Sequence, residues 1–323
     1  MGKKKPSTRK AARKRRASST PQPERTVPPV DPRASERVLS DIGRLLSDRE
    51  FASKEELNAF LQQIVASGEV PAPKPRSPLD QAQDLIYDAW ESSGERSVEL
   101  ARRALEISPD CADAYLLLAE ETAETLEKAR NLYEQAVKAG ERALGPEKFK
   151  EYAGHFWGFV KTRPYMRARA ALAECLWMLG ERRQAIEHCT EMLRLNPGDN
   201  QGMRHILVNY LLEEGDDEAA ERLLDEYEGE DTATWLYSRA LSEFRREGAS
   251  REARLRLKEA VAYNPFVPRY ILGKKKLPTH LPELIGRGDE DEAIAYTSRA
   301  IKVWRKTPGA REWLAGSVTG RGA

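Results

Sequence analysis

The chain has 323 residues, of which 40% are hydrophobic, 33% charged and 7% aromatic. This composition, without long apolar runs, excludes a membrane span and favours a helical protein with much exposed surface. Three cysteines, Cys111, Cys175 and Cys189, in a chain without a signal peptide exclude a disulfide framework and indicate reduced thiols in the cytoplasm.

The net charge of +1 conceals a strong asymmetry along the chain. Residues 1–33 carry 11 basic and two acidic side chains, a net charge of +9, which leaves −8 on the remaining residues. Because this segment is rich in proline and serine and poor in apolar residues, we expect a disordered basic tail. Its residues 3–16 are suited to weak, nonspecific binding of nucleic acid through phosphates, or serve only as a solubilising arm. The lack of interleaved aromatic residues favours the solubilising arm.

Residues 34–70 are predicted to form a small helical hairpin. Apolar residues recur on one helical face between residues 38 and 46. Ser53 and Glu56 have the spacing of a capping box at the start of the second helix. Four prolines between residues 71 and 78 then indicate a semi-extended linker and a domain boundary.

From residue 79 onward the sequence is helical almost everywhere, and it repeats. Glycine ends one helix in a left-handed conformation, and alanine lets the next helix approach the first closely. Proline then ends the pair, because it cannot continue a helix. A period near 34 residues with these marks is typical of the tetratricopeptide repeat. The residues that carry the pattern are Gly180, Gly215 and Gly248, then Ala185, Ala220 and Ala253 five residues later, and Pro197 and Pro265, each preceded by asparagine.

Two weaker copies precede these repeats, at residues 79–107 and 112–139. We therefore expect an all-α, tetratricopeptide-like helical solenoid at residues 79–315, with about five helix pairs. A C-terminal capping helix begins after Asp289 and covers the last repeat, and residues 316–323 form a disordered tail. The first helices of the pairs are expected to line the concave side of the solenoid.

The stretch from Cys175 to Cys189 raises the question of a metal or thiol site, because Glu187 and His188 directly precede Cys189. A zinc site needs four ligands at tight spacings, and no such set is present in the sequence. Cys189 falls four residues after Ala185 in a buried repeat position, whereas His188 is expected to point to solvent. We therefore interpret the cysteines as small core residues.

Catalytic motifs are also missing from the sequence. It contains no Gly-rich phosphate loop, no HExxH and no nucleophile elbow, and its four histidines are scattered. We therefore expect no enzyme, no bound metal and no cofactor.

Residues 155–169 concentrate aromatic and basic side chains outside the repeat pattern, and two interpretations are open. The first is a ledge of aromatic and arginine side chains that binds a ligand or peptide. The second, which we favour, is that the aromatic rings fill a gap at a long connection of the solenoid. The residues concerned are Phe156, Trp157, Phe159, Lys161, Arg163, Tyr165, Arg167 and Arg169.

Two blocks go beyond the generic repeat pattern. They are "CADAYLLLAEETAETLEKARNLYEQAVKAGE" at residues 111–141 and, within residues 260–314, "AVAYNPFVPRYILGKKKLP" with "RGDEDEAIAYTSRAIKVWRKTPGAREWL". Both resemble the suppressor-of-tumorigenicity-seven family, and the resemblance covers roughly residues 79–315. It implies a helical repeat protein without catalytic residues. Animal members look like integral membrane proteins with hydrophobic N-terminal segments; this chain departs from them in its basic N-terminus, and we expect a soluble, bacterial-type member.

A concave helical groove binds extended or helical peptides, so the leading hypothesis is a cytoplasmic, non-catalytic protein–protein interaction scaffold. No lysine stands at the position of His205, so we do not expect a receptor for chaperone tails. The alternative is a nucleic-acid-associated protein that uses the basic tail, with the solenoid as a recruitment module. The expected partner contacts are exposed positions on first helices: Arg167, Glu174, Trp177, His205, Asn209, Trp235, Arg245 and Arg246.

Overall fold

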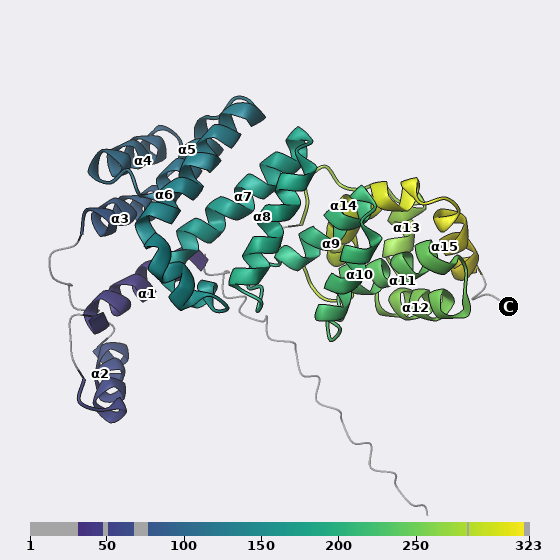
Figure 1. Ribbon diagram of the computed structural model, residues 1–323, viewed down its shortest axis with the longest axis horizontal. Coiled ribbons are helices and arrows are strands. Elements are labelled where there is room, and N and C mark those ends of the chain that lie inside the picture. Colours follow the sequence, from purple (N-terminus) through teal and green to yellow (C-terminus); the bar gives the residue numbers. More distant parts are fainter. Residues whose placement is uncertain (1–31, 48–50, 68–76, 283, 320–323) are drawn as a thin grey trace, which may run out of the picture.

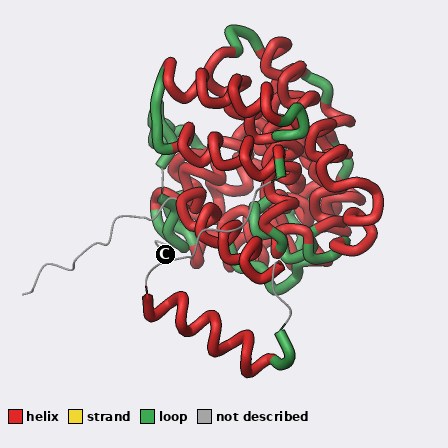
Figure 2. The backbone as a smooth tube through the Cα atoms, turned by 90° about the vertical axis from the view of Figure 1, so that its left-hand side faces the viewer, coloured by secondary structure: helices red, strands yellow, loops and turns green. Residues whose placement is uncertain are grey.

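The structure is a computed structural model that describes residues 32–47, 51–67, 77–282 and 284–319. Helices and loops make up these residues, with no strand among them (Figure 2). The predicted tail up to residue 31, the linker at residues 71–76 and the last four residues lie outside the described part. Residues 316–319, which we expected in a C-terminal tail, instead belong to a helix.

Five helix pairs follow one another along the chain and confirm the all-α, tetratricopeptide-like fold (Figure 1). First helices of neighbouring pairs contact each other, α3 with α5, α5 with α7 and α9 with α11. We call the surface that these first helices form the first-helix face. The pairs are α3 (Pro78–Trp90) and α4 (Glu95–Ile107), α5 (Ala112–Thr122) and α6 (Leu126–Tyr152), α7 (Arg163–Leu179) and α8 (Arg182–Leu195), α9 (Met203–Glu214) and α10 (Asp217–Glu226), and α11 (Ala233–Glu247) and α12 (Arg251–Tyr263).

The predicted glycines end the first helices of their pairs, and the predicted alanines are buried between the two helices of a pair. Gly180 and Gly215 end α7 and α9 in the left-handed conformation, with φ of 85° and 83°. Gly248 ends α11 with φ 66° and ψ −152°, which is another backbone region that favours glycine. The three alanines that follow, Ala185, Ala220 and Ala253, are fully buried, so the second helix of each pair packs closely on the first.

A break inside α6 makes room for the segment at residues 155–169. Gly145 has φ 69° and ψ 161°, and Pro146 follows it, so the helix changes direction there. The short 3-10 helices η1 (Phe156–Gly158) and η2 (Val160–Thr162) then lead into α7. Phe156 is fully buried between Phe149 and Tyr165, with ring centroids 5.2 and 6.1 Å away. The gap-filling interpretation is therefore confirmed for Phe156 and Tyr165.

The C-terminal helices cover more than the last repeat. α14 (Glu290–Lys306) follows the short α13 (Val267–Ile271) and packs against α9 and α11, while α15 (Ala310–Thr319) packs against α12 and α13. Tyr296 and Trp304 of α14 are buried, and the Trp304 indole donates a hydrogen bond to the Tyr296 hydroxyl at 2.8 Å. α14 thus covers the first-helix face in the C-terminal half of the solenoid.

Two helices form in the segment predicted as a hairpin, and the first of them packs on the solenoid. α1 (Pro32–Ser47) lies against α3 and η2, while α2 (Lys54–Ser67) stands apart from the helix pairs (Figure 1). At the start of α2 the backbone N–H of Glu56 donates to the Ser53 hydroxyl at 3.2 Å. The Glu56 carboxylate accepts from the N–H of Ala52 at 2.8 Å, one residue away from the expected reciprocal partner.

Candidate partner-binding surface

Three of the eight predicted contact residues lie underneath α14 or inside the core. Trp235 is fully buried; its indole N–H donates to the backbone carbonyl of Leu224 at 3.3 Å, and its ring meets His205 edge to face at 5.6 Å. Asn209 is buried and donates to the carbonyl of His205 at 2.7 Å. The prediction that these positions are exposed is wrong for Asn209 and Trp235. Trp235 packs on Leu224, Tyr227 and His205, between neighbouring repeats, and Asn209 is buried on α9, the helix that α14 contacts. His205 is partly buried, and burial lowers its pKa to about 4.

Arg167, at the other end of the solenoid, is held by two carboxylates. Its guanidinium donates to Asp113 of α5 at 2.6 and 2.9 Å and to Glu36 of α1 at 2.8 and 2.9 Å. It also stacks over Trp90 at 5.2 Å. Burial alone would lower the pKa of Arg167, but the charges of Asp113 and Glu36 outweigh it and raise that pKa. The predicted contact residue is therefore already engaged within the chain.

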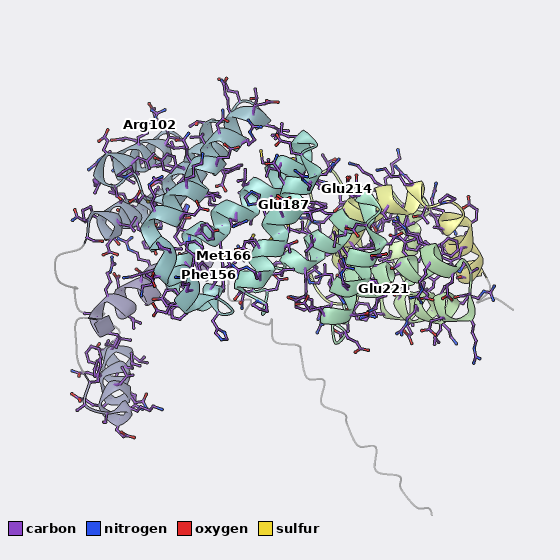
Figure 3. The ribbon with its side chains drawn as sticks, in the orientation of Figure 1. Arg102, Phe156, Met166, Glu187, Glu214 and Glu221 are labelled. Carbon is purple, nitrogen blue, oxygen red and sulfur yellow. The ribbon has the colours of Figure 1, made fainter. Side chains whose placement is uncertain are left out.

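Three further predicted residues form ion pairs nearer the surface. Glu174 pairs with Arg299 of α14 at 3.3 Å, and both side chains are about half exposed. Arg246 is half exposed and pairs with Glu243 and with Glu221 of α10, which is labelled in Figure 3. Arg245 is partly buried; it pairs with Asp217 of α10 at 3.0 Å and donates to the backbone carbonyl of Leu212 at 2.7 Å.

Trp177 is the centre of an ordered aromatic and cationic group. Its ring stacks on Tyr210 with centroids 3.6 Å apart and an interplanar angle of 5°. The Arg182 guanidinium lies over the other face of the ring, 3.8 Å from its centroid. Trp177 remains only partly buried, so this rigid stack reaches the surface at the carboxyl end of α7.

A hollow of about 390 Å³ adjoins this stack. Glu213 connects the two, because it lies 3.8 Å from both Arg182 and Lys306, and it lines the hollow together with Arg245. We call Trp177, Arg182, Glu213, Arg245 and Lys306 the Trp177 edge. The structure therefore brings Trp177 and Arg245 of the predicted set to one surface, and Arg246 to another.

A second cavity, of about 270 Å³, lies in the N-terminal half between α3, α6 and α7. Its walls include Gln83, Tyr87 and Leu144, and Ser40 of α1 stands at its edge. It adjoins the segment at residues 155–169, whose Phe159 is exposed and stacks on Tyr152 at 3.8 Å. This cavity is mixed in character, with Asp80, Asp110, Lys148 and Lys161 among its lining residues.

The cysteine and histidine stretch is part of the packed scaffold. Cys175 and Cys189 are buried, and burial raises the pKa of the Cys189 thiol to about 12. His188 does not point freely to solvent as predicted: it is half buried, and burial lowers its pKa to about 4. Among the described residues, no group of three or more histidine, cysteine or carboxylate side chains is placed to hold a metal ion.

Sequence reasoning missed the residues that organise these surfaces. Arg182 directly follows a predicted repeat boundary, and Tyr210 lies on a predicted helix, so the repeat pattern placed both in helices but not against Trp177. Glu36 gave no local signal, because its partner Arg167 is 131 residues away.

None of the described helices is both long and apolar enough to cross a membrane.

Residues 76–321 match the family model described as "ST7 protein". The human "Suppressor of tumorigenicity 7 protein-like" is 30% identical over 261 residues, which covers 73% of this chain and 45% of that protein. The rat "Suppressor of tumorigenicity 7 protein" is 30% identical over 283 residues, covering 73% of this chain and 48% of that protein. The chain thus spans about half the length of the curated relatives it matches.

Among solved structures, "YrrB: a TPR protein with an unusual peptide-binding site" aligns with a TM-score of 0.42 and 18% sequence identity. The alignment covers 63% of this chain and 91% of that protein.

Proposed function

Because the chain belongs to the ST7 protein family, we propose that it is a non-catalytic protein–protein interaction scaffold that binds its partner at the Trp177 edge. The observation that carries the proposal is the stack of Arg182, Trp177 and Tyr210 at the surface. Tryptophan, tyrosine and arginine are the residues most enriched among the energetic centres of protein interfaces. A ring fixed between two neighbours loses little conformational entropy when a partner covers it, so the affinity per contact is higher.

The position of the edge also supports the proposal. In the C-terminal half, α14 already occupies the first-helix face, so a partner meets the rim of that face and not its floor. The Trp177 edge is at this rim, where the exposed Lys306 offers a cation and the 390 Å³ hollow, which Arg245 lines, gives room for a side chain. A peptide or protein segment with an apolar side chain followed by a carboxylate fits this combination.

The cellular location is part of the same proposal. The three cysteines are free and buried, which is compatible with a reducing compartment such as the cytoplasm.

The test is affinity capture from a lysate of the source cells at moderate salt, followed by a binding measurement with each captured protein in purified form. The baits are the wild-type chain, the Trp177→Ala/Arg245→Glu variant and a matched control, Leu255→Ala/Arg254→Glu. The control removes one exposed apolar side chain and reverses one exposed arginine on α12. A partner that binds the wild type and the control, and loses at least tenfold in affinity for the edge variant, supports the proposal.

A further bait, lacking residues 1–31, tests the alternative function. Phosphate binding by a basic tail weakens steeply with salt. If capture requires those residues and disappears after nuclease treatment, the protein is nucleic-acid-associated and the Trp177 edge is not its main site.

A further inference from the structure

The contact between α1 and the solenoid is made mainly by charges. Arg37 pairs with Asp88 at 2.8 Å, and Arg44 with Asp84 at 3.3 Å, so α1 runs antiparallel to α3. On its other side Glu36 accepts two hydrogen bonds from Arg167 of α7. We call the surface formed by Asp84, Asp88, Trp90, Asp113, Arg163 and Arg167 the α1 seat.

α1 adds little to the hydrophobic core. Leu45 is buried and Ile42 and Leu46 are partly buried, but none of them belongs to the two core clusters, and Val38 and Leu39 are 48% and 44% exposed. In α14, by contrast, the buried set includes Tyr296 and Trp304. Since apolar burial is the dominant stabilising term in packing, α14 is a permanent part of the core, while α1 is attached mostly by ion pairs.

The seat is internally satisfied on the solenoid side. Asp113 accepts from Arg167 and also from the Gln83 amide at 2.9 Å. Arg167 keeps Asp113 and the face of Trp90 as partners when Glu36 leaves. Departure of α1 therefore leaves Arg167 and Asp113 paired with each other, while Asp84 gives up its ion pair with Arg44 at a surface that then opens to water. The seat thus avoids an isolated Arg167 charge, the condition that usually makes breaking an internal ion pair so costly.

The family match adds an independent observation. It begins at residue 76, so every residue of the seat lies inside the matched segment and α1 lies outside it. The seat is thus a surface of the family domain, and α1 is an additional segment that covers it.

We propose that the α1 seat is a second docking surface, with α1 as its resident occupant, and that it receives a helix from a partner protein. The inference goes beyond the proposed function, because it concerns a different surface and a different kind of ligand. The partner helix carries a glutamate for Arg167 and Arg163, followed by two arginines for Asp88 and Asp84. Arg37 and Arg44 are seven residues apart, two helical turns, so such arginines lie on one helix face.

When a partner helix displaces α1 from the seat, the ion pairs between α1 and the seat are replaced by equivalent ion pairs between the partner helix and the seat. The main obstacle is the tether, because a flexibly attached segment competes at an effective concentration on the order of mM. Weakening the chain's own α1 therefore raises the apparent affinity of an added helix by the factor by which the unoccupied fraction of the seat rises.

The experiment measures fluorescence anisotropy of a labelled synthetic peptide with the sequence of residues 32–50, titrated with three full-length chains. These are the wild type, the opened variant Arg37→Glu/Arg44→Glu and the control Arg102→Glu/Arg103→Glu. The control has the same change in net charge, and both of its residues are exposed on α4; Arg102 lies on the side away from α1 (Figure 3). Circular dichroism establishes that each chain remains helical. Arg37→Glu alone, at a side chain that is 35% exposed, is a milder opened variant.

We expect the peptide to bind the opened variant at least tenfold more tightly than the wild type or the control. A peptide carrying Arg37→Glu/Arg44→Glu should not bind, and Trp177→Ala in the receiving chain should leave the peptide affinity unchanged. That last result separates this inference from the proposed function. Equal affinity for all three chains, or no binding to either opened variant, would overturn the inference and make α1 a fixed structural helix. Concentration-dependent dimers that exchange α1 would identify a second copy as the occupant and overturn the assignment to a partner protein.

Discussion

Glu292, near the start of α14, caps the amino terminus of α11: its carboxylate accepts a hydrogen bond from the backbone N–H of Ala233 at 2.9 Å. The same buried carboxylate accepts from the Asn264 amide at 3.0 Å and from the N–H of Gly288 at 2.8 Å. One side chain therefore joins α11, the end of α12 and the loop before α14.

We expect Glu292→Gln to lower the free energy of unfolding by about 1–3 kcal/mol, because the glutamine NH₂ group faces donors where an acceptor stood. Urea unfolding followed by circular dichroism measures the change. Glu228→Gln, at an exposed position, is the control and should remain within about 0.5 kcal/mol of the wild type. Equal effects of the two substitutions would show that the Glu292 hub contributes no stability.

Gly140 of α6 marks the closest approach of α6 to α7. A Cβ atom there would lie 2.9 Å from Cβ and 3.1 Å from the backbone Cα of Tyr165. We expect Gly140→Ala to destabilise the fold by about 1–3 kcal/mol, because overpacking outweighs the gain in helix propensity. Thermal melts followed by circular dichroism measure the change. In them Gly316→Ala, at an exposed helical position with open space around it, should be neutral or stabilising. A Gly140→Ala chain at least as stable as the wild type would show that the two helices separate freely.

Tyr296→Phe tests whether α14 is fixed on the first-helix face. The substitution leaves the buried Trp304 indole N–H without its acceptor, while the ring stack between Tyr296 and Tyr237 is kept. We expect a loss of about 1–3 kcal/mol, together with a changed tryptophan emission spectrum. Tyr115→Phe, at a partly buried ring outside α14, provides the comparison. An unchanged unfolding midpoint would mean that α14 is not packed as the structure has it.

The acid sensitivity of the fold should depend on His188. Burial, with Arg169 nearby, lowers the pKa of His188 to about 4, whereas an unfolded histidine has a pKa of about 6.5. The folded state therefore binds fewer protons than the unfolded state between these values. This contribution to stability is complete above about pH 6.5 and is lost progressively as the pH falls toward 4.

We accordingly expect His188→Gln to reduce the drop in melting temperature between about pH 7.5 and about pH 5. The exposed His155→Gln substitution should leave that drop unchanged. If both variants follow the wild-type profile, protonation of His188 is not coupled to unfolding.

The helix pairs were predictable because their signals are local. Glycine at a helix end, alanine five residues later and proline at the end of the pair each act within a few residues. The burial of Ala185 and Cys189 follows from the same register, and both are buried as predicted.

The face on which a side chain functions was less predictable, because it depends on distant segments. Asn209 was expected to be exposed on a first helix, but it is buried on α9, which α14 contacts from a distant part of the chain. The repeat pattern describes contacts between neighbours and could not show this, whereas the burial of Trp235 against Leu224 and His205 is a contact between neighbouring repeats that was assigned to the wrong side of the helix. The Trp177 edge was found only in part: Trp177 and Arg245 were predicted, but Arg182, Glu213 and Lys306 join them only through the three-dimensional packing.

The return of α14 to the middle of the solenoid has a consequence for how the array unfolds. In linear repeat arrays each unit is stabilised only by adjacent units, so ends fray and unfolding proceeds stepwise. Here Arg299 of α14 contacts Glu174 of α7, 125 residues earlier in the chain, and α14 also packs on α9 and α11. This closure raises the sequence separation of the stabilising contacts, and we expect it to make the helices from α7 to α15 unfold as one cooperative unit. Amide protons of α9 and α11 should therefore exchange with a common protection factor, instead of a gradient that increases away from the C-terminus.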